Sequence, residues 1–184
     1  MSRREFVFGI PLLVSTAIGL DSALSQTSSS STFEMVSFKP PVPAPKFTLN
    51  DLAGASRTIG PEGPKKFTLL NFWATWCPPC VHELPSLQSL HDTMDQERFS
   101  LLAVSVDIEA NTPRIFEFRD KYGLKFPIAQ DANSEIANNW GVRQFPSTFL
   151  VGPRGDILAA AKGERVWHSK AAIGYFNSVV ENYE

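Results

Sequence analysis

The sequence predicts an α/β domain built on a mixed central sheet, and three observations lead to this fold class. Two apolar runs, residues 67–73 and 100–106, are nearly continuous, as expected of strands that are covered on both faces. Between and after these runs, apolar residues recur every three or four positions, which is the period of an amphipathic helix. Near the C-terminus, the turn-rich residues 152–155 join two short apolar segments and predict an antiparallel hairpin.

A hairpin, two buried strands and the helix between them are expected in the first half of the domain. Residues 47–49 and 57–59 flank a turn rich in Asn, Asp and Gly, which predicts an N-terminal hairpin. After the strand at 67–73, a helix should run from about residue 78 to residue 97. Its apolar face carries Val81, Leu84, Leu87, Leu90 and Met94.

A second helix should begin at Thr112, because this threonine is a suitable cap and Pro113 then occupies the first helical position. Gly123 is suited to end this helix. A short strand at residues 126–129 and a helix at 134–140 are expected next.

The strands 147–151 and 156–162 form the C-terminal hairpin, and a last helix carries Ala172, Phe176, Val179 and Tyr183 on one face. Early strands alternate with helices, so these strands should be parallel, with helices on both faces of the sheet.

Residues 1–25 have the layout of an export signal. Arg3 and Arg4 precede an apolar run, and small residues at Ala23 and Ser25 predict cleavage before Gln26. The start Ser-Arg-Arg-x-Phe resembles the twin-arginine export motif, and an ordinary secretory signal with two arginines is an equal alternative. The run is short for a membrane span of ~20 residues, yet an uncleaved anchor stays open. We therefore expect an exported, periplasmic protein.

Residues 26–45 are interpreted as a flexible linker rich in Ser and Pro. Residues 26–32 are polar and low in complexity, so they have little apolar surface to bury. Pro40, Pro41, Pro43 and Pro45 favour an extended, stiff segment. A spacer from a membrane and a disordered remainder of the signal are both compatible with this composition. The folded domain is expected over residues 46–184.

Composition and charge exclude several classes of function. The 17 basic and 19 acidic residues give a formal net charge of -2, so there is no electrostatic footprint for nucleic acid. The two cysteines cannot build a disulfide scaffold or a four-cysteine zinc site. We expect neither a metal nor a bound cofactor, only a redox-active disulfide.

Both cysteines lie in Trp76-Cys-Pro-Pro-Cys80, where the first buried strand leads into a helix. A helix N-terminus stabilises a thiolate, which is the reactive form of cysteine. Cys77 precedes the helix and should attack a substrate disulfide, whereas Cys80, one turn further and more buried, should resolve the mixed disulfide. Half of a metal site is the alternative. Haem attachment is excluded, because Val81 stands where a histidine would be required.

Pro78 and Pro79 predict a reductant rather than an oxidant. Pro79 lacks a backbone N–H that would otherwise reach the Cys77 sulfur, so the thiolate receives fewer donors. A dithiol whose reduced form is poorly stabilised is a reductant. Both prolines also suit the first turn of a helix, and the two explanations are compatible.

Glu83 lies three residues after Cys80, on the same side of the helix, and is placed to accept or relay the proton of Cys80. An acidic residue that merely suits the first turns of a helix is the alternative. Trp76 is expected to be exposed and to contact partners, and Trp73 to be in the core.

These motifs together resemble the TlpA/ResA/CcmG group of exported thioredoxin-like proteins, over about residues 46–184. The resemblance rests on residues 71–80, 83–85, 122–124, 141–142 and 145–150. It implies a thioredoxin-like fold with an N-terminal hairpin extension and a central βα insertion. It also implies that Glu83 lies beside the cysteines and that Pro146 is cis. Pro146, with Phe145, would then expose backbone to an extended substrate.

The resemblance implies a thiol–disulfide oxidoreductase that reduces protein disulfides, with substrates in cytochrome c maturation or copper-site assembly. It further implies a membrane thiol donor of the CcdA/DsbD kind that keeps Cys77 and Cys80 reduced. A peroxiredoxin-like peroxidase is a weaker alternative, because Thr75 and the upstream residues do not match the Pro-x-x-x-Thr/Ser-x-x-Cys pattern. A Sco-like copper chaperone would need a wider cysteine spacing and a distal histidine, for which His168 is the candidate.

Overall fold

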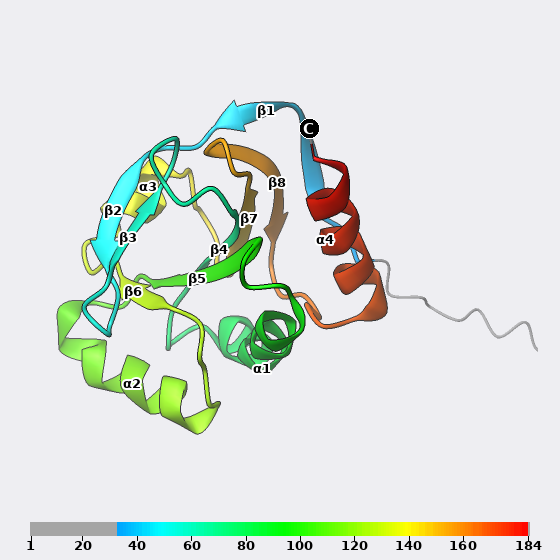
Figure 1. Cartoon of the computed structure of the whole chain (residues 1–184). Coiled ribbons are helices and arrows are strands. Elements are labelled where there is room, and N and C mark those ends of the chain that lie inside the picture. Colours follow the sequence, from blue (N-terminus) through cyan, green and yellow to red (C-terminus); the bar gives the residue numbers. More distant parts are fainter. Residues whose placement is uncertain (1–32, 184) are drawn as a thin grey trace, which may run out of the picture. The chain divides into compact units, whose positions relative to one another are not determined.

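A six-stranded mixed sheet organises residues 33–183, the part of the chain that the computed structural model describes (Figure 1). In spatial order its strands are β1 (Val36–Pro43), β8 (Asp156–Lys162), β7 (Ser147–Val151), β4 (Phe67–Trp73), β5 (Phe99–Ser105) and β6 (Ile128–Gln130). The strands β4, β5 and β6 are parallel, whereas β1, β8, β7 and β4 pair antiparallel. The predicted mixed sheet is therefore confirmed. The export signal predicted over residues 1–25 lies outside the described residues.

The remaining elements are a separate hairpin and the helices. The strands β2 (Phe47–Asn50) and β3 (Ser56–Ile59) form a two-stranded sheet of their own, as the sequence predicts. The helices are α1 (Pro78–Thr93), α2 (Thr112–Lys121), α3 (Glu135–Asn139) and α4 (Lys170–Asn182), with a short 3-10 helix at Glu109–Asn111. Among the described residues, no helix has the length and apolar character needed to cross a membrane.

Helices cover both faces of the sheet (Figure 1). On one face, Phe118 of α2 contacts Trp73, and Phe176 of α4 contacts Phe99. The helix α1 lies on this face as well, and its Glu83 accepts a hydrogen bond from Asn71 of β4. On the opposite face, Trp140 at the end of α3 contacts Phe72 and Phe149. Phe47 of the hairpin β2–β3 packs on the same tryptophan, so the hairpin and α3 share that face.

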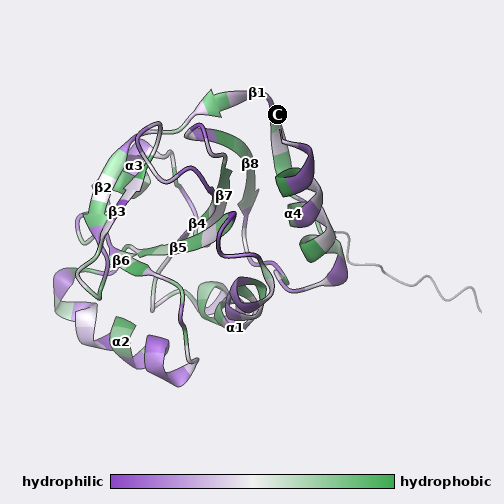
Figure 2. Ribbon diagram, viewed as in Figure 1, coloured by the Kyte–Doolittle hydropathy of each residue, from purple (hydrophilic) through white to green (hydrophobic). Residues whose placement is uncertain are grey.

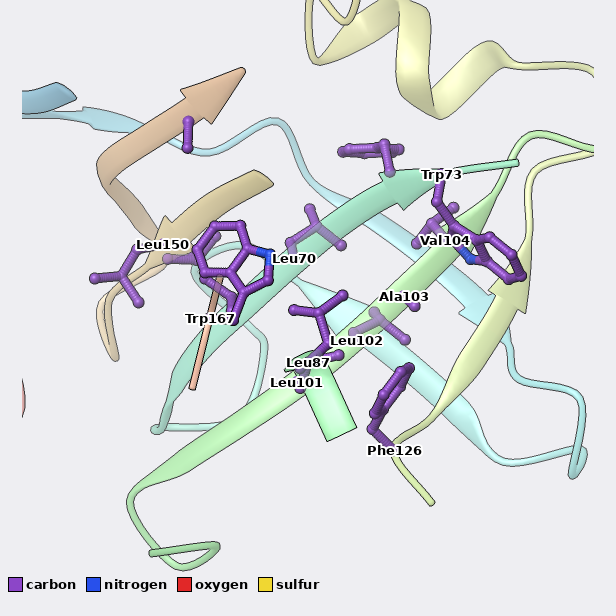
Figure 3. Packing of buried hydrophobic residues seen from close by; sticks show 14 of the residues in the cluster. Leu70, Trp73, Leu87, Leu101, Leu102, Ala103, Val104, Phe126, Leu150 and Trp167 are labelled. Atoms are coloured by element: carbon purple, nitrogen blue, oxygen red, sulfur yellow. The ribbon is translucent and has the colours of Figure 1, made fainter. Parts of the chain in front are cut away.

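Buried hydrophobic residues of the sheet and helices form one core. Every residue of β4 is buried, and β5 is buried except for Ser100. In Figure 2 the middle of the sheet is hydrophobic, whereas the exposed helix α2 is largely hydrophilic. Figure 3 shows members of the core cluster from several elements, among them Leu70, Leu87, Leu102 and Trp167. The near-continuous apolar runs in the sequence thus mark strands that are covered on both faces.

The prediction of a flexible linker over residues 26–45 is wrong for residues 36–43, which form the edge strand β1. Val36 pairs with Ala160 and Val42 with Ile157, and the register shifts between Ser37 and Val42, where the adjacent prolines lie. Proline cannot donate to a ladder, but an edge strand needs donors on only one side, so prolines are tolerated there. The folded unit consequently begins before residue 46.

Smaller differences concern element ends. The helix α1 ends at Thr93 rather than near residue 97, because Met94 adopts an extended conformation. Gly123 follows α2 with a φ of 59°, the left-handed conformation that suits glycine after a helix. The helix α4 buries Ala172, Phe176 and Val180, so its buried face lies one position away from the predicted Val179.

A candidate redox site at the start of helix α1

The two cysteines form a disulfide at the N-terminus of α1. The Sγ atoms of Cys77 and Cys80 are 2.15 Å apart and the Cα atoms 5.3 Å apart. Cys77 is the N-cap residue of the helix, which begins at Pro78. Cys77 is 5% exposed and Cys80 is fully buried. Cys77 is therefore the more accessible sulfur, in the expected order, although little of it reaches the surface.

The sulfur of Cys77 accepts a hydrogen bond from one backbone N–H of the first helical turn. The N–H of Cys80 donates to Cys77 Sγ at 3.3 Å. Pro78 and Pro79 occupy the intervening positions and have no N–H to donate. The disulfide thus lies at the positive end of a helix whose first turn is poor in hydrogen-bond donors.

Glu83 is buried on α1, one turn after Cys80, within a cage of three donors. It is 1% exposed. Its Oε1 accepts from Asn71 Nδ2 at 2.8 Å. Its Oε2 accepts from Trp167 Nε1 at 2.8 Å and from the backbone N–H of Arg165 at 3.1 Å. A buried carboxyl with this many donors is held in a fixed place.

Burial and the donor cage act on the acidity of Glu83 in opposite directions. Removal from water disfavours the charged form and raises the pKa of Glu83 to about 7, above its ordinary value of 4.5. The three donors and the neighbouring Glu164 are smaller influences: the donors lower this pKa, and the negative charge of Glu164 raises it. Glu83 can therefore be neutral or ionised near neutral pH.

Trp76, the neighbour of Cys77, contacts Phe145, which precedes Pro146 at the start of β7. Trp76 precedes Cys77 and is 58% exposed, as expected, whereas Trp73 is fully buried. The rings of Trp76 and Phe145 meet edge to face, with centroids 5.8 Å apart. The Phe145–Pro146 bond is cis, which agrees with the resemblance, and the Lys39–Pro40 bond, which was not predicted, is also cis. The structure thus joins two segments that lie far apart in sequence.

Several residues of the site were given no role from the sequence. Asn71 bonds to Glu83 and also to Thr148 Oγ1, at 2.9 Å. The sequence feature that could have indicated a role for Asn71 is a polar side chain within a buried strand, because buried polar groups need hydrogen-bond partners. No local pattern indicated Trp167 or Arg165, which reach Glu83 from a loop after β8.

Asp107 is a second carboxylate that the sequence interpretation missed. It is fully buried, and it accepts from the backbone N–H of Thr75 at 2.8 Å and from the Thr75 hydroxyl at 2.7 Å. Ser105 Oγ donates to it at 2.6 Å. These bonds tie the end of β5 to the turn that carries Trp76 and Cys77.

The histidines are placed apart from this cage. His82 is exposed and lies 3.8 Å from Glu164, and His168 is exposed on the loop before α4. His91 is half-buried, and burial lowers its pKa. Within residues 33–183, no group of three or more side chains of His, Cys, Asp or Glu is placed to hold a metal ion.

A Cys-x-x-Cys disulfide that caps a helix after a central strand of a mixed sheet defines the thioredoxin-like thiol–disulfide oxidoreductases. Residues 41–160 match the AhpC/TSA family, and the chain belongs to this family. Within it, the chain is a thiol–disulfide oxidoreductase of the ResA kind, as its curated relatives indicate.

The thiol-disulfide oxidoreductase ResA of Halalkalibacterium halodurans is 35% identical over 122 residues, which are 65% of this chain and 66% of that protein. ResA of Geobacillus thermodenitrificans is 34% identical, over 65% of this chain and 67% of that protein. The matched part is thus about two thirds of the length of these relatives.

Solved structures show the same fold. StoA from Bacillus subtilis is 31% identical, with a TM-score of 0.58, and covers 68% of this chain and 92% of its own. A putative thiol:disulfide interchange protein DsbE from Chlorobium tepidum has a TM-score of 0.65 at 23% identity, covering 76% of this chain and 96% of its own. At that identity the likeness shows the fold alone.

Proposed function

We propose that the protein is exported and acts mainly as a reductant of protein disulfides through Cys77 and Cys80. The observation that carries this proposal is the Cys77–Cys80 disulfide at the start of α1, one turn before the buried Glu83, whose pKa is raised to about 7. A thiolate is needed for attack, and a proton acceptor is needed for the second thiol. The N-terminus of α1 would favour the thiolate, and Glu83 would be the proton acceptor.

The proposed reaction has two exchange steps. In the reduced protein, the Cys77 thiolate attacks one sulfur of a substrate disulfide and displaces the other as a thiolate, forming a mixed disulfide. Cys80 then loses its proton and attacks Cys77 Sγ, so that the Cys77–Cys80 disulfide forms and the second substrate thiolate leaves. The substrate gains two electrons and leaves as two thiolates, which take up protons from Glu83 or from solvent, and the dithiol of the protein loses the two electrons.

Glu83 is the proposed acceptor of the Cys80 proton. A carboxyl whose pKa lies near the working pH can both take and release a proton. With a pKa of about 7, Glu83 is partly ionised at neutral pH. Its position one turn after Cys80 on α1 supports this role.

The proposal of a reducing rather than an oxidising dithiol rests on the first turn of α1. Stabilisation of the reduced form makes a dithiol a stronger oxidant, and backbone donors to the thiolate supply part of that stabilisation. Here Pro78 and Pro79 have no N–H, so within this turn the Cys77 sulfur accepts its hydrogen bond from the Cys80 N–H. A redox titration against glutathione tests this. We expect a potential in the range of thioredoxin, about -270 mV, and a value near that of DsbA, about -120 mV, would refute it.

The substrate is proposed to be an extended segment of a protein that docks along Trp76, Phe145 and Pro146. The exposed indole of Trp76 and the ring of Phe145 offer an apolar contact next to Cys77. Substrates in cytochrome c maturation or copper-site assembly follow from the resemblance to the TlpA/ResA/CcmG group. An exported reductant needs a source of electrons, so we propose a membrane thiol donor of the CcdA/DsbD kind.

Substitution Cys80→Ser tests the assignment of the two cysteines. With the resolving thiol removed, partners should remain bound to Cys77 as mixed disulfides, which a non-reducing gel and mass spectrometry would identify. The matched control is Cys77→Ser, which should trap far less, because Cys80 is fully buried. Equal trapping by both variants, or stronger trapping by Cys77→Ser, would contradict the assignment.

The two alternatives from the sequence make different predictions for the same protein. A copper chaperone would bind Cu(I) stoichiometrically in its reduced form, and a peroxidase would consume hydrogen peroxide at the expense of a thiol. We expect faster turnover with a protein disulfide such as insulin than with peroxide, and no copper-dependent change in thiol titration.

A further inference from the structure

Two of the three donors to Glu83 come from one loop, which is held against α1. The loop follows β8 and supplies Trp167 Nε1 and the Arg165 N–H, both to Glu83 Oε2. Ser86, one turn after Glu83 on α1, fastens the loop. Its hydroxyl oxygen accepts the Trp167 N–H at 3.2 Å, and its hydrogen lies between two acceptors, the Glu83 carbonyl at 2.9 Å and the Arg165 carbonyl at 3.3 Å. The loop therefore has a defined position relative to Glu83.

The N-terminal segment before β1 covers this loop from outside. The Phe33 ring lies with its centroid 5.5 Å from that of Trp167 and 5.6 Å from that of Phe176. The Glu34 carbonyl accepts from Arg165 Nε at 3.4 Å. Met35, which follows, is buried. Phe33 and Glu34 thus contact Trp167 and Arg165, the two loop residues that donate to Glu83.

We propose that Trp167 is a positioning residue for Glu83, and that residues 33–35 keep Trp167 in place, so that proton exchange at the dithiol depends on the packing of the N-terminal segment. Both segments lie outside residues 41–160, the part that matches the family. The inference rests on the role of Glu83 in the proposed function and adds the structural elements that set its environment.

The indole N–H is the part of Trp167 that acts on Glu83. It donates to a carboxylate from which water is excluded, where a hydrogen bond to a charged group is strong. Of the donors to Glu83, Trp167 is also the one that most lowers the pKa of this carboxyl. Loss of this donor leaves Oε2 with the Arg165 N–H, so the ionised form becomes less stable.

The other groups around Glu83 include two charged residues of the same loop, Glu164 and Arg165, and neutral side chains of the sheet. Glu164 carries a negative charge that raises the pKa of Glu83, and His82 on α1 lies 3.8 Å from Glu164. The Arg165 guanidinium donates to the carbonyls of Gly163, Glu164 and Glu34. The strands β4 and β7 present the neutral Asn71 and Thr148 to this site. The substitution of Trp167 by Phe changes the charge of none of these groups.

The test is Trp167→Phe in the full chain, which keeps an aromatic ring and removes the N–H. We expect the titration midpoint of Glu83, followed by NMR of 13C-labelled carboxyl groups in the oxidised protein, to rise by about one pH unit. The matched control is Phe176→Leu, which alters a ring in contact with both Phe33 and Trp167 but removes no donor. It should lower stability and leave the midpoint within a few tenths of a unit.

The N-terminal segment is tested by Phe33→Ala, with the exposed Val36→Ala as its control. We expect a smaller rise of the Glu83 midpoint for Phe33→Ala and none for Val36→Ala. An unchanged midpoint in Trp167→Phe, or an equal rise in Phe176→Leu, would overturn the inference. The readout does not depend on the catalytic role of Glu83. That role fails separately if Glu83→Gln leaves the pH profile of Cys77 alkylation unchanged.

Discussion

The two faces of β4 and β7 carry different chemistry, although they are formed by alternate residues of the same strands. On the face towards α1, Asn71 and Thr148 are register partners that bond to each other, and Asn71 continues to Glu83. On the face towards α3, the next residues, Phe72 and Phe149, pack against each other and Trp140. Because side chains alternate along a strand, one pair of strands presents a polar site and an apolar core.

The difference between the two faces separates residues that contribute mainly to stability from residues that contribute to redox chemistry. The aromatic face buries large rings, and burial of such side chains is a major source of folding free energy. The polar face holds a carboxyl whose desolvation costs stability when it ionises. Ionisation of Glu83 on the polar face therefore lowers the stability of the fold at neutral pH. Packing of the aromatic rings on the other face contributes stability that compensates for this loss.

The largest expected effect is on the aromatic face. Substitution Trp140→Ala removes a buried ring that contacts Phe47, Phe72 and Phe149, so it should lower the free energy of unfolding by about 3–5 kcal/mol. Urea unfolding at neutral pH measures this loss. The separation of the two faces would break down if the same variant moved the titration midpoint of Glu83 as strongly as Trp167→Phe does.

A smaller effect, with a distinct pH dependence, is expected on the polar face. The pKa of Glu83 is raised in the folded protein, so the stability provided by its neutral form is complete below about pH 4.5 and is lost as the pH rises through about 7. The loss amounts to about 3 kcal/mol. Glu83→Gln has no ionisable group there, so its stability should lack this decline.

Unfolding of the oxidised wild type and of Glu83→Gln at a series of pH values between 4 and 8.5 measures the difference between them. The curves should diverge with rising pH, with the variant relatively more stable at high pH. Parallel curves would show that the pKa of Glu83 is the same in the folded and the unfolded protein, which would contradict the prediction.

The smallest effect is predicted for Thr148→Val, which removes the hydroxyl that accepts from Asn71 Nδ2. We expect a loss of about 1 kcal/mol in the free energy of unfolding, because one donor of a buried amide loses its partner. The Glu83 midpoint should rise slightly, since Asn71 is held less firmly. The neighbouring Phe149→Leu is the control on the opposite face, and a comparable rise in that variant would contradict the comparison.

Some features of this protein were readable from local sequence. The apolar run at Phe67–Trp73 predicted β4 with the bounds that the structure has, because a strand covered on both faces needs no polar residue for solvent. The placement of Cys77 before Pro78 predicted a cysteine at a helix start. Thr68 and Asn71 are the polar residues within β4, and the amide of Asn71 could have been interpreted as the mark of a buried partner.

Other features depend on contacts between distant segments. The prolines near residue 40 indicated a linker, yet pairing with β8, more than a hundred residues away, makes this segment an edge strand. Likewise, the Trp167 indole donates to Glu83 although the two residues are 84 positions apart in the sequence. Neither contact leaves a periodic pattern, since each depends on where the chain returns rather than on its neighbours.

The sequence by itself determined the dithiol, its position at a strand-to-helix junction and the class of fold, because periodicity, capping and proline placement act between adjacent residues. The tertiary structure alone decided the environment of the dithiol: the burial of Glu83, its three donors and the N-terminal segment packed against two of them. Desolvation and hydrogen bonding depend on distances in space, and those distances are set when the whole core packs.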